Sequence, residues 1–89
     1  MRTPLRLIIA DDHALFRQGL KSLLLLQPDT QVVAEIESAD DVEPVVSDTD
    51  SDILLLDLQM DRWMMEDIAR LSRLTNVIVL TASESGKWS

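Results

Sequence analysis

Short, almost wholly apolar runs alternate with longer helical patterns along this chain, and the alternation limits the folds open to it. The runs LRLIIA and ILLL, at residues 5–10 and 53–56, are nearly continuous in aliphatic residues. Such runs are typical of strands that are covered on both faces. Parallel strands need long crossover connections, usually helices. The sequence therefore predicts successive βαβ units around a parallel sheet.

The expected elements can be placed along the chain by periodicity and by breaking residues. The first helix has apolar residues, including Phe16, at spacings of three and four residues. Asp12 is placed to cap its N-terminus. Pro28 ends the helix, because it disfavours helical geometry at the residue before it. The second helix is expected to be short or distorted, because Pro44 is tolerated only in a first turn. Strands are predicted at residues 5–10, 32–36, 52–57 and 76–81. The first and third helices are predicted at residues 13–26 and 64–74, and the second is expected to begin after an N-cap at Ser38 or Asp40.

Length and composition indicate one globular domain over residues 1–89. Hydrophobic residues make up 46% and charged residues 27% of the chain, which excludes the compositions of disordered and membrane proteins. The net charge of -8 opposes binding to nucleic acids and anionic membranes and favours a cation as ligand.

The absence of cysteine and the short apolar stretch at the N-terminus indicate which chemistry and which cellular compartment the chain suits. The chain has no cysteine, which rules out disulfide and zinc-thiolate chemistry within it. The apolar stretch near the N-terminus is cut by Asp11 well short of a signal peptide or a membrane span. We therefore expect a cytoplasmic protein.

Acidic and hydroxyl side chains stand where the predicted strands end. Asp11 and Asp12 follow the first strand, Asp57 ends the third and Thr81 ends the fourth. The carboxyl ends of strands form the ligand-binding edge of an open parallel sheet. If the second strand lies on the far flank of the first, right-handed crossovers place the third beside the first, and the three carboxylates converge.

Three converging carboxylates repel one another, so a metal-free site should be strained or should hold a group of raised pKa. Mg²⁺ resolves the repulsion because it takes oxygen ligands and retains water in an open site. With the metal in place, Asp57 is suited to attack a phosphoryl group and form an aspartyl-phosphate, while Thr81 donates its hydroxyl to a phosphoryl oxygen.

The segments IIADDHALFRQGL, DILLLDLQM and VIVLTAS resemble the receiver domain of two-component response regulators, over about residues 5 to 83. The segments DDHALFRQGLKSLL and VVAEIESADD further resemble the branch that usually carries a helix-turn-helix DNA-binding output domain. The resemblance implies a flavodoxin-like doubly wound α/β fold with strand order 2-1-3-4, and a phosphoacceptor switch rather than an enzyme. Its phosphodonor would be a sensor histidine kinase, and the switch would control transcription.

The resemblance also implies a role for individual residues. Asp57 would be the phosphoacceptor, Asp12 a direct Mg²⁺ ligand, and Asp11 a ligand acting mainly through water. The backbone carbonyl of Gln59 would complete the protein ligands. Thr81 would be the hydroxyl switch, and Ala82 the small residue that leaves room for the phosphoryl group.

The chain departs from the family pattern in two places. Asp61, Arg62 and Trp63 stand where the family usually has proline and a glycine-containing loop, which puts them beside the pocket. The family's fifth strand with its lysine, and its last helix, are missing from the pattern, and Lys87 follows Thr81 too soon to be that lysine. A truncated receiver would leave residues 76–81 as an exposed edge, from which we expect self-association.

Other interpretations stand beside this one. A truncated or degenerate receiver-like module would act only through protein association. An aspartate-nucleophile phosphatase is disfavoured because Gln59 stands where such enzymes have a second acid. His13 is expected to face solvent on the first helical turn, Trp63 either packs or marks a partner surface, and the methionines at 60, 64 and 65 are expected to pack.

Overall fold

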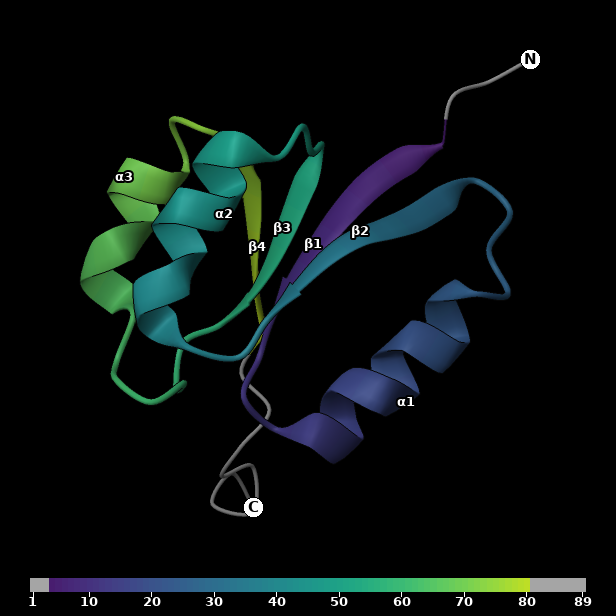
Figure 1. Cartoon of the computed structure of the whole chain (residues 1–89), viewed down its shortest axis with the longest axis horizontal. Coiled ribbons are helices and arrows are strands. Elements are labelled where there is room, and N and C mark those ends of the chain that lie inside the picture. Colours follow the sequence, from purple (N-terminus) through teal and green to yellow (C-terminus); the bar gives the residue numbers. More distant parts are fainter. Residues whose placement is uncertain (1–3, 81–89) are drawn as a thin grey trace, which may run out of the picture.

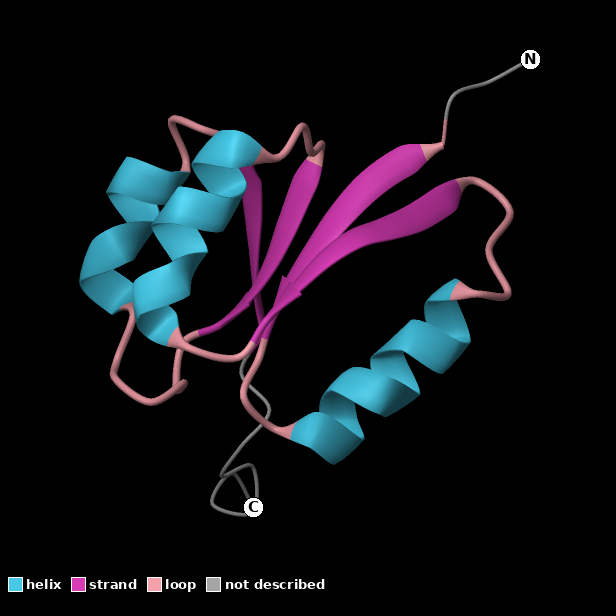
Figure 2. Ribbon diagram, viewed as in Figure 1, coloured by secondary structure: helices cyan, strands magenta, loops and turns pink. Residues whose placement is uncertain are grey.

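The computed structural model describes residues 4–80 of the chain, and they form one parallel sheet between two helical layers (Figures 1 and 2). Helix α1 (Ala14–Leu24) lies on one face of the sheet, and α2 (Val42–Asp48) and α3 (Ile68–Leu71) lie on the other. This confirms the predicted doubly wound α/β architecture and strand order. The order is β2-β1-β3-β4, with β1 Leu5–Ala10, β2 Thr30–Ile36, β3 Ile53–Asp57 and β4 Asn76–Leu80.

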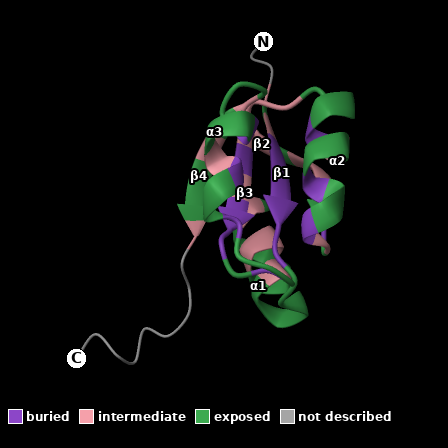
Figure 3. Ribbon diagram, turned by 90° about the vertical axis from the view of Figure 1, so that its left-hand side faces the viewer, coloured by how far each residue is buried: buried purple, intermediate pink, exposed green. Residues whose placement is uncertain are grey.

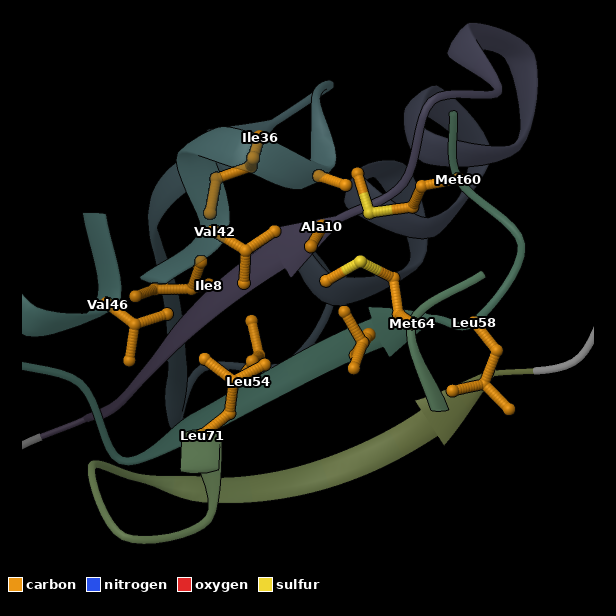
Figure 4. Packing of buried hydrophobic residues seen from close by; sticks show 12 residues of the cluster. Ile8, Ala10, Ile36, Val42, Val46, Leu54, Leu58, Met60, Met64 and Leu71 are labelled. Carbon is orange, nitrogen blue, oxygen red and sulfur yellow. The ribbon is translucent and has the colours of Figure 1, made fainter. Parts of the chain in front are cut away.

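The hydrophobic core lies between the sheet and the layer of α2 and α3 (Figure 4). Alternate residues of the two central strands point into it, because strand side chains have a period of two. Ile8 and Leu54 are fully buried there, and Val42 and Leu71 cover them from the helices. Met60 and Met64 are buried in the same cluster, as expected, whereas Met65 is 48% exposed.

The register of the central strands fixes where their last residues fall. Ala10 of β1 pairs with Leu56 of β3, so Asp11, just after β1, and Asp57, the last residue of β3, lie side by side at this edge. On the other flank, the Asp11 amide donates to the carbonyl of Ile36 at 3.0 Å. The connections from β1 and β3 run to opposite faces of the sheet (Figure 1), which makes this edge a topological switch point.

The start of the first helix differs from the prediction. Helix α1 begins at Ala14, its N-cap is His13 rather than Asp12, and no side chain caps it. The reason is local: the Asp11 carboxylate accepts a hydrogen bond from the His13 amide at 2.7 Å, and this turn delays the helix. The next strand begins at Thr30, earlier than predicted, because its register with Leu5 extends the pairing.

The apolar face of α1 is only partly covered by the sheet. Leu15 and Leu23 are 87% and 64% exposed, although their spacing predicts a packed face. The polar residues Arg17 and Lys21 instead turn toward β2, where both form ion pairs with Glu35. Within the described residues, α1 has no fully buried side chain.

The second and third helices are short. As expected, the second is distorted: a 3-10 turn, η1 (Ala39–Asp41), precedes α2, and Pro44 lies in the first turn of α2. Ser38 precedes η1 and Asp41 precedes α2, but neither side chain makes a capping bond, and Asp40 lies inside η1. The third helix is shorter than predicted, with a 3-10 turn, η2 (Met65–Asp67), before α3.

Strand β4 is one of the two outer strands of the described sheet, and it is more exposed than the central strands (Figure 3). Ile78 and Val79 are 47% and 37% exposed. Thr81, which the sequence places at the end of this strand, lies outside the described residues. None of the helices in the part that the structure describes is long and apolar enough to cross a membrane.

The burial pattern predicts that the same substitution lowers stability strongly at one leucine and hardly at all at another. Leu56→Ala removes a side chain that is fully buried and should lower the free energy of unfolding by about 2–5 kcal/mol. Leu15→Ala removes one that is 87% exposed and should change it by less than about 0.5 kcal/mol. Urea denaturation measures both, and equal losses would contradict this placement of the core.

Candidate functional site

The three predicted carboxylates meet at the carboxyl edge of the sheet. One ligand atom from each of Asp11, Asp12 and Asp57, together with one ring nitrogen of His13, lie within 4.8 Å of one another. We call Asp11, Asp12 and Asp57 the carboxylate cluster. The structure therefore brings together the acids that the strand ends predict.

Asp11 is the most deeply buried member of the carboxylate cluster, with 2% of its surface exposed. Its amide is bound to β2, and its Oδ1 accepts the His13 amide. The guanidinium of Arg17 donates to its backbone carbonyl. These three contacts hold the turn after β1 in place, so the carboxylate has little freedom to move away from its neighbours.

Asp57 is 5% exposed and lies at the end of β3. Its Oδ1 accepts a hydrogen bond from the Gln59 amide at 3.0 Å, which fixes the side chain. Burial raises the pKa of the Asp57 carboxyl above its ordinary value, and the charges of Asp11 and Asp12 raise it further. The repulsion predicted from the sequence is thus present at this group.

His13 lies closer to the cluster than the sequence suggests. Its side chain is 65% exposed, but Nδ1 lies 3.1 Å from Asp11 Oδ1, 3.1 Å from Asp12 Oδ1 and 3.4 Å from Asp57 Oδ2. The hydrogen bond to Asp11 and the charge of Asp12 raise the pKa of the imidazole. His13 is exposed to solvent, as expected, and the turn at Asp11 also brings one edge of its ring against the carboxylates.

The loop after β3 connects the site edge to the α2 side of the molecule. Asp61 accepts hydrogen bonds from the Ala39 amide at 2.8 Å and from the Ser38 hydroxyl at 3.2 Å. The Met64 amide donates to the Leu58 carbonyl and closes the loop. The sequence predicts Asp61 beside the pocket. In the structure its side chain instead links the loop to the start of η1. Trp63 is 56% exposed, so packing alone does not account for it.

One polar group that sequence reasoning missed is the buried Asp67. Arg62 donates to it at 2.9 Å and Arg70 also donates to it. Burial opposes its ionisation, but the two guanidinium groups together lower the pKa of its carboxyl below the ordinary value. This ion-pair group lines a hollow of about 440 Å³ between α2 and α3 that includes none of the carboxylate cluster.

Thr81, Ala82 and Lys87 lie outside the described residues. Gln59 is described, and its amide binds Asp57. The role of its carbonyl as a metal ligand stays a prediction.

The donor set of the cluster fits a hard divalent cation. Carboxylate oxygens from two neighbouring strand ends converge, two of the acids are buried, and a ring nitrogen of His13 lies beside them. Mg²⁺ is usually bound by one or two carboxylates plus water in such an open site. Fold and site together define an acidic cluster at the switch point of a doubly wound sheet, with a donor set that fits a cation.

Comparison with known proteins identifies the family. Residues 7–87 match the model of the response regulator receiver domain. The chain is 34% identical over 87 residues to the nitrate/nitrite response regulator protein NarP of Escherichia coli, and 32% identical over 81 residues to the transcriptional regulatory protein DegU of Brevibacillus brevis. The chain therefore belongs to the response regulator receiver domain family.

These relatives are considerably longer than the region they share with this chain. The matches cover 93% and 89% of this chain but only 40% and 34% of NarP and DegU. Among solved structures, the non-phosphorylated receiver domain of the stress response regulator RcsB from Escherichia coli superposes with a TM-score of 0.80 at 25% identity. That match covers 96% of this chain and 70% of the RcsB domain.

The raised pKa of Asp57 predicts that the metal-free protein gains stability when this charge is removed. Asp57→Asn keeps an acceptor for the Gln59 amide and should raise the free energy of unfolding at pH 7 by about 1 kcal/mol. A raised carboxyl pKa costs stability as pH rises through the folded-state value, so the gain should vanish below about pH 3, where both states are protonated. Denaturant titration at both pH values measures it.

Asp52→Asn is the matched control for this prediction. The Arg6 amide and guanidinium hold the pKa of the Asp52 carboxyl below its ordinary value, so its ionised form stabilises the fold. The control should therefore destabilise the protein at pH 7. Destabilisation by both substitutions would show that the carboxylate cluster is not strained.

Proposed function

We propose that this chain is the phosphoacceptor domain of a two-component response regulator, in which phosphorylation of Asp57 switches partner binding and transcriptional output. The observation that carries the proposal is the position of Asp57: it is 5% exposed at the end of β3, with Asp11 and Asp12 beside it. Family membership over residues 7–87 supports the same role.

Asp11, Asp12 and Asp57 would hold Mg²⁺, with the carbonyl of Gln59 as a further ligand. The bound metal would supply positive charge to offset the charge of the phosphoryl oxygens. A hydrogen bond from the Gln59 amide to Oδ1 orients the Asp57 carboxylate and leaves Oδ2 directed at the pocket. This orientation suits Oδ2 as the attacking atom.

The phosphodonor would be a phosphohistidine of a sensor kinase. Asp57 would form a bond to phosphorus as the phosphorus–nitrogen bond of the donor breaks, and the released imidazole nitrogen would take up a proton. Thr81 would then bind a phosphoryl oxygen through its hydroxyl, and Ala82 would leave room for the group. The domain is thus a self-phosphorylating switch instead of an enzyme with turnover.

The partners follow from the same role. A sensor histidine kinase would dock at the site edge, where Trp63 is 56% exposed and offers an aromatic contact. With a net charge of -8, the chain itself would not bind DNA. Any transcriptional output would be exerted through a separate DNA-binding domain, and the location would be cytoplasmic.

Small-molecule phosphorylation tests the proposal. Incubation with Mg²⁺ and acetyl phosphate should add one phosphoryl group, detected by intact mass, and hydroxylamine should remove it because an acyl phosphate is labile to that nucleophile. Asp57→Asn should abolish the adduct, whereas Asp48→Asn, at the exposed end of α2, should retain it. A wild-type protein that gains no phosphoryl group at saturating Mg²⁺ would contradict phosphoacceptor function.

A second candidate function is association alone, and the exposed apolar surface favours it. Strand β4 pairs with β3 on one side, and its other edge has no partner strand among residues 4–80. Ile78 is 47% exposed on this strand, and Leu15 and Leu23 are exposed on α1. Unpaired apolar edges are normally paired or covered, so we propose that a second copy binds at this edge.

Sedimentation velocity at physiological salt tests this association. The wild-type chain should show a concentration-dependent dimer, and Ile78→Lys should shift it to monomer because a charge on the edge opposes pairing. Ser72→Lys, at the exposed C-cap of α3, adds the same charge away from the edge and should leave the dimer intact. A monodisperse wild-type monomer at high concentration would exclude the association.

A further inference from the structure

We propose that Arg17 is a positioning residue for the phosphoacceptor site: from α1, its guanidinium group holds the backbone carbonyl of Asp11 and so sets the directions of the Asp11 and Asp12 carboxylates. The inference rests on the proposed function, since those carboxylates are its metal ligands. It goes beyond that function by making the cation affinity of the site depend on a side chain of α1 that is not itself a ligand.

The guanidinium group of Arg17 has an acceptor at each of its three nitrogens. Nη1 donates to the Asp11 carbonyl, Nε donates to Glu35 at 3.2 Å, and Nη2 donates to Glu37 at 2.7 Å. The side chain is 11% exposed, and burial of such a group is costly unless its donors are bound. Because the guanidinium fork is planar and rigid, the two glutamates hold Nη1 against the carbonyl.

The bond to the Asp11 carbonyl acts on the peptide group that joins two of the acids. The carbonyl of Asp11 and the amide of Asp12 belong to one planar unit, so a donor on that carbonyl limits the rotation of the whole plane. On the other side of Asp11, its amide donates to the Ile36 carbonyl at 3.0 Å. With both of these peptide groups held, the backbone directions of Asp11 and Asp12 are set before a cation binds.

The orientation of α1 agrees with this role. An amphipathic helix normally turns its apolar stripe to the sheet, yet Arg17 and Lys21 face β2. Leu15 and Leu23 are 87% and 64% exposed instead. The Arg17 amide donates to the His13 carbonyl at 2.9 Å, so Arg17 lies one helical turn beyond the turn that it holds. The helix therefore keeps this polar contact and leaves apolar surface uncovered by the described sheet.

Lys21 supplies a matched control on the same helix. Its ammonium group lies 2.8 Å from Glu35 and contributes more than Arg17 to holding the pKa of the Glu35 carboxyl below its ordinary value. Both residues therefore link α1 to β2, but the bond to the Asp11 carbonyl comes from Arg17. Loss of an ion pair with Glu35 should have similar effects at either position, whereas loss of the positioning contact should appear at Arg17 alone.

Amide hydrogen exchange of the metal-free full chain, followed by NMR, tests the contact without the metal. The His13 amide donates to Asp11 Oδ1 at 2.7 Å, so its exchange rate reports whether the turn stays in place. The amide of Leu56, in a buried central strand, reports overall stability. The ratio of the His13 rate to the Leu56 rate should rise in Arg17→Gln and stay at the wild-type value in Lys21→Gln.

Isothermal titration calorimetry with MgCl₂ tests the consequence for the site. Arg17→Gln should weaken Mg²⁺ binding about tenfold or more and Lys21→Gln less than about threefold, because contacts that orient metal ligands typically change affinity about 10–100-fold. Arg17→Lys keeps the charge but replaces the fork by a single ammonium group. It should also bind Mg²⁺ more weakly than the wild type, and it serves as the second variant if circular dichroism shows Arg17→Gln to be unfolded.

Three results would overturn the inference and leave the Mg²⁺ site intact. They are an unchanged exchange ratio for His13 in Arg17→Gln, equal losses of Mg²⁺ affinity in Arg17→Gln and Lys21→Gln, and wild-type affinity in Arg17→Lys, which would show that charge alone suffices. A wild-type chain that binds no Mg²⁺ would instead overturn the proposed function. The exchange ratio, measured without metal, would still decide the contact between Arg17 and Asp11.

Discussion

Repulsion between buried carboxylates is the interaction on which the rest of this structure depends. The parallel register of β1 and β3 pairs Ala10 with Leu56 and so sets Asp11 and Asp57 side by side at the sheet edge. Both acids are almost fully buried, where water screens their charges poorly. Charges placed in this way repel one another, and a cation near them would lower the free energy of the site.

The surrounding contacts keep those carboxylates from separating. Asp11 is bound through its backbone to β2, and Asp57 is bound through Oδ1 to the Gln59 amide. Asp61 links the loop after β3 to η1, so the site edge is connected to the helices on the α2 side. The same loop carries the exposed side chain of Trp63. On the opposite face, α1 leaves apolar surface that the described sheet does not cover.

The βαβ pattern and the acids at strand ends could be predicted because both are local patterns. The strand order came from the family resemblance, since right-handed crossovers alone leave the flank of the second strand open. The start of α1 could not be predicted, because it depends on which backbone amide the Asp11 side chain takes. The position of His13 follows from that same turn. The ion pairs of Asp67 were also missed, since Arg62 and Arg70 come together on it only once η2 and α3 have formed. Thr81 lies outside the described residues and stays a prediction.

Carboxyl-carbon NMR during a Mg²⁺ titration tests the central claim most directly, namely that three acids from two strand ends form one cation site. If they do, the resonances of Asp11, Asp12 and Asp57 should all shift with a single midpoint, and the resonance of Asp52, at the opposite end of β3, should not shift with them. A titration in which Asp57 stays unchanged while the other two respond, or in which all aspartates shift weakly without saturation, would contradict the account.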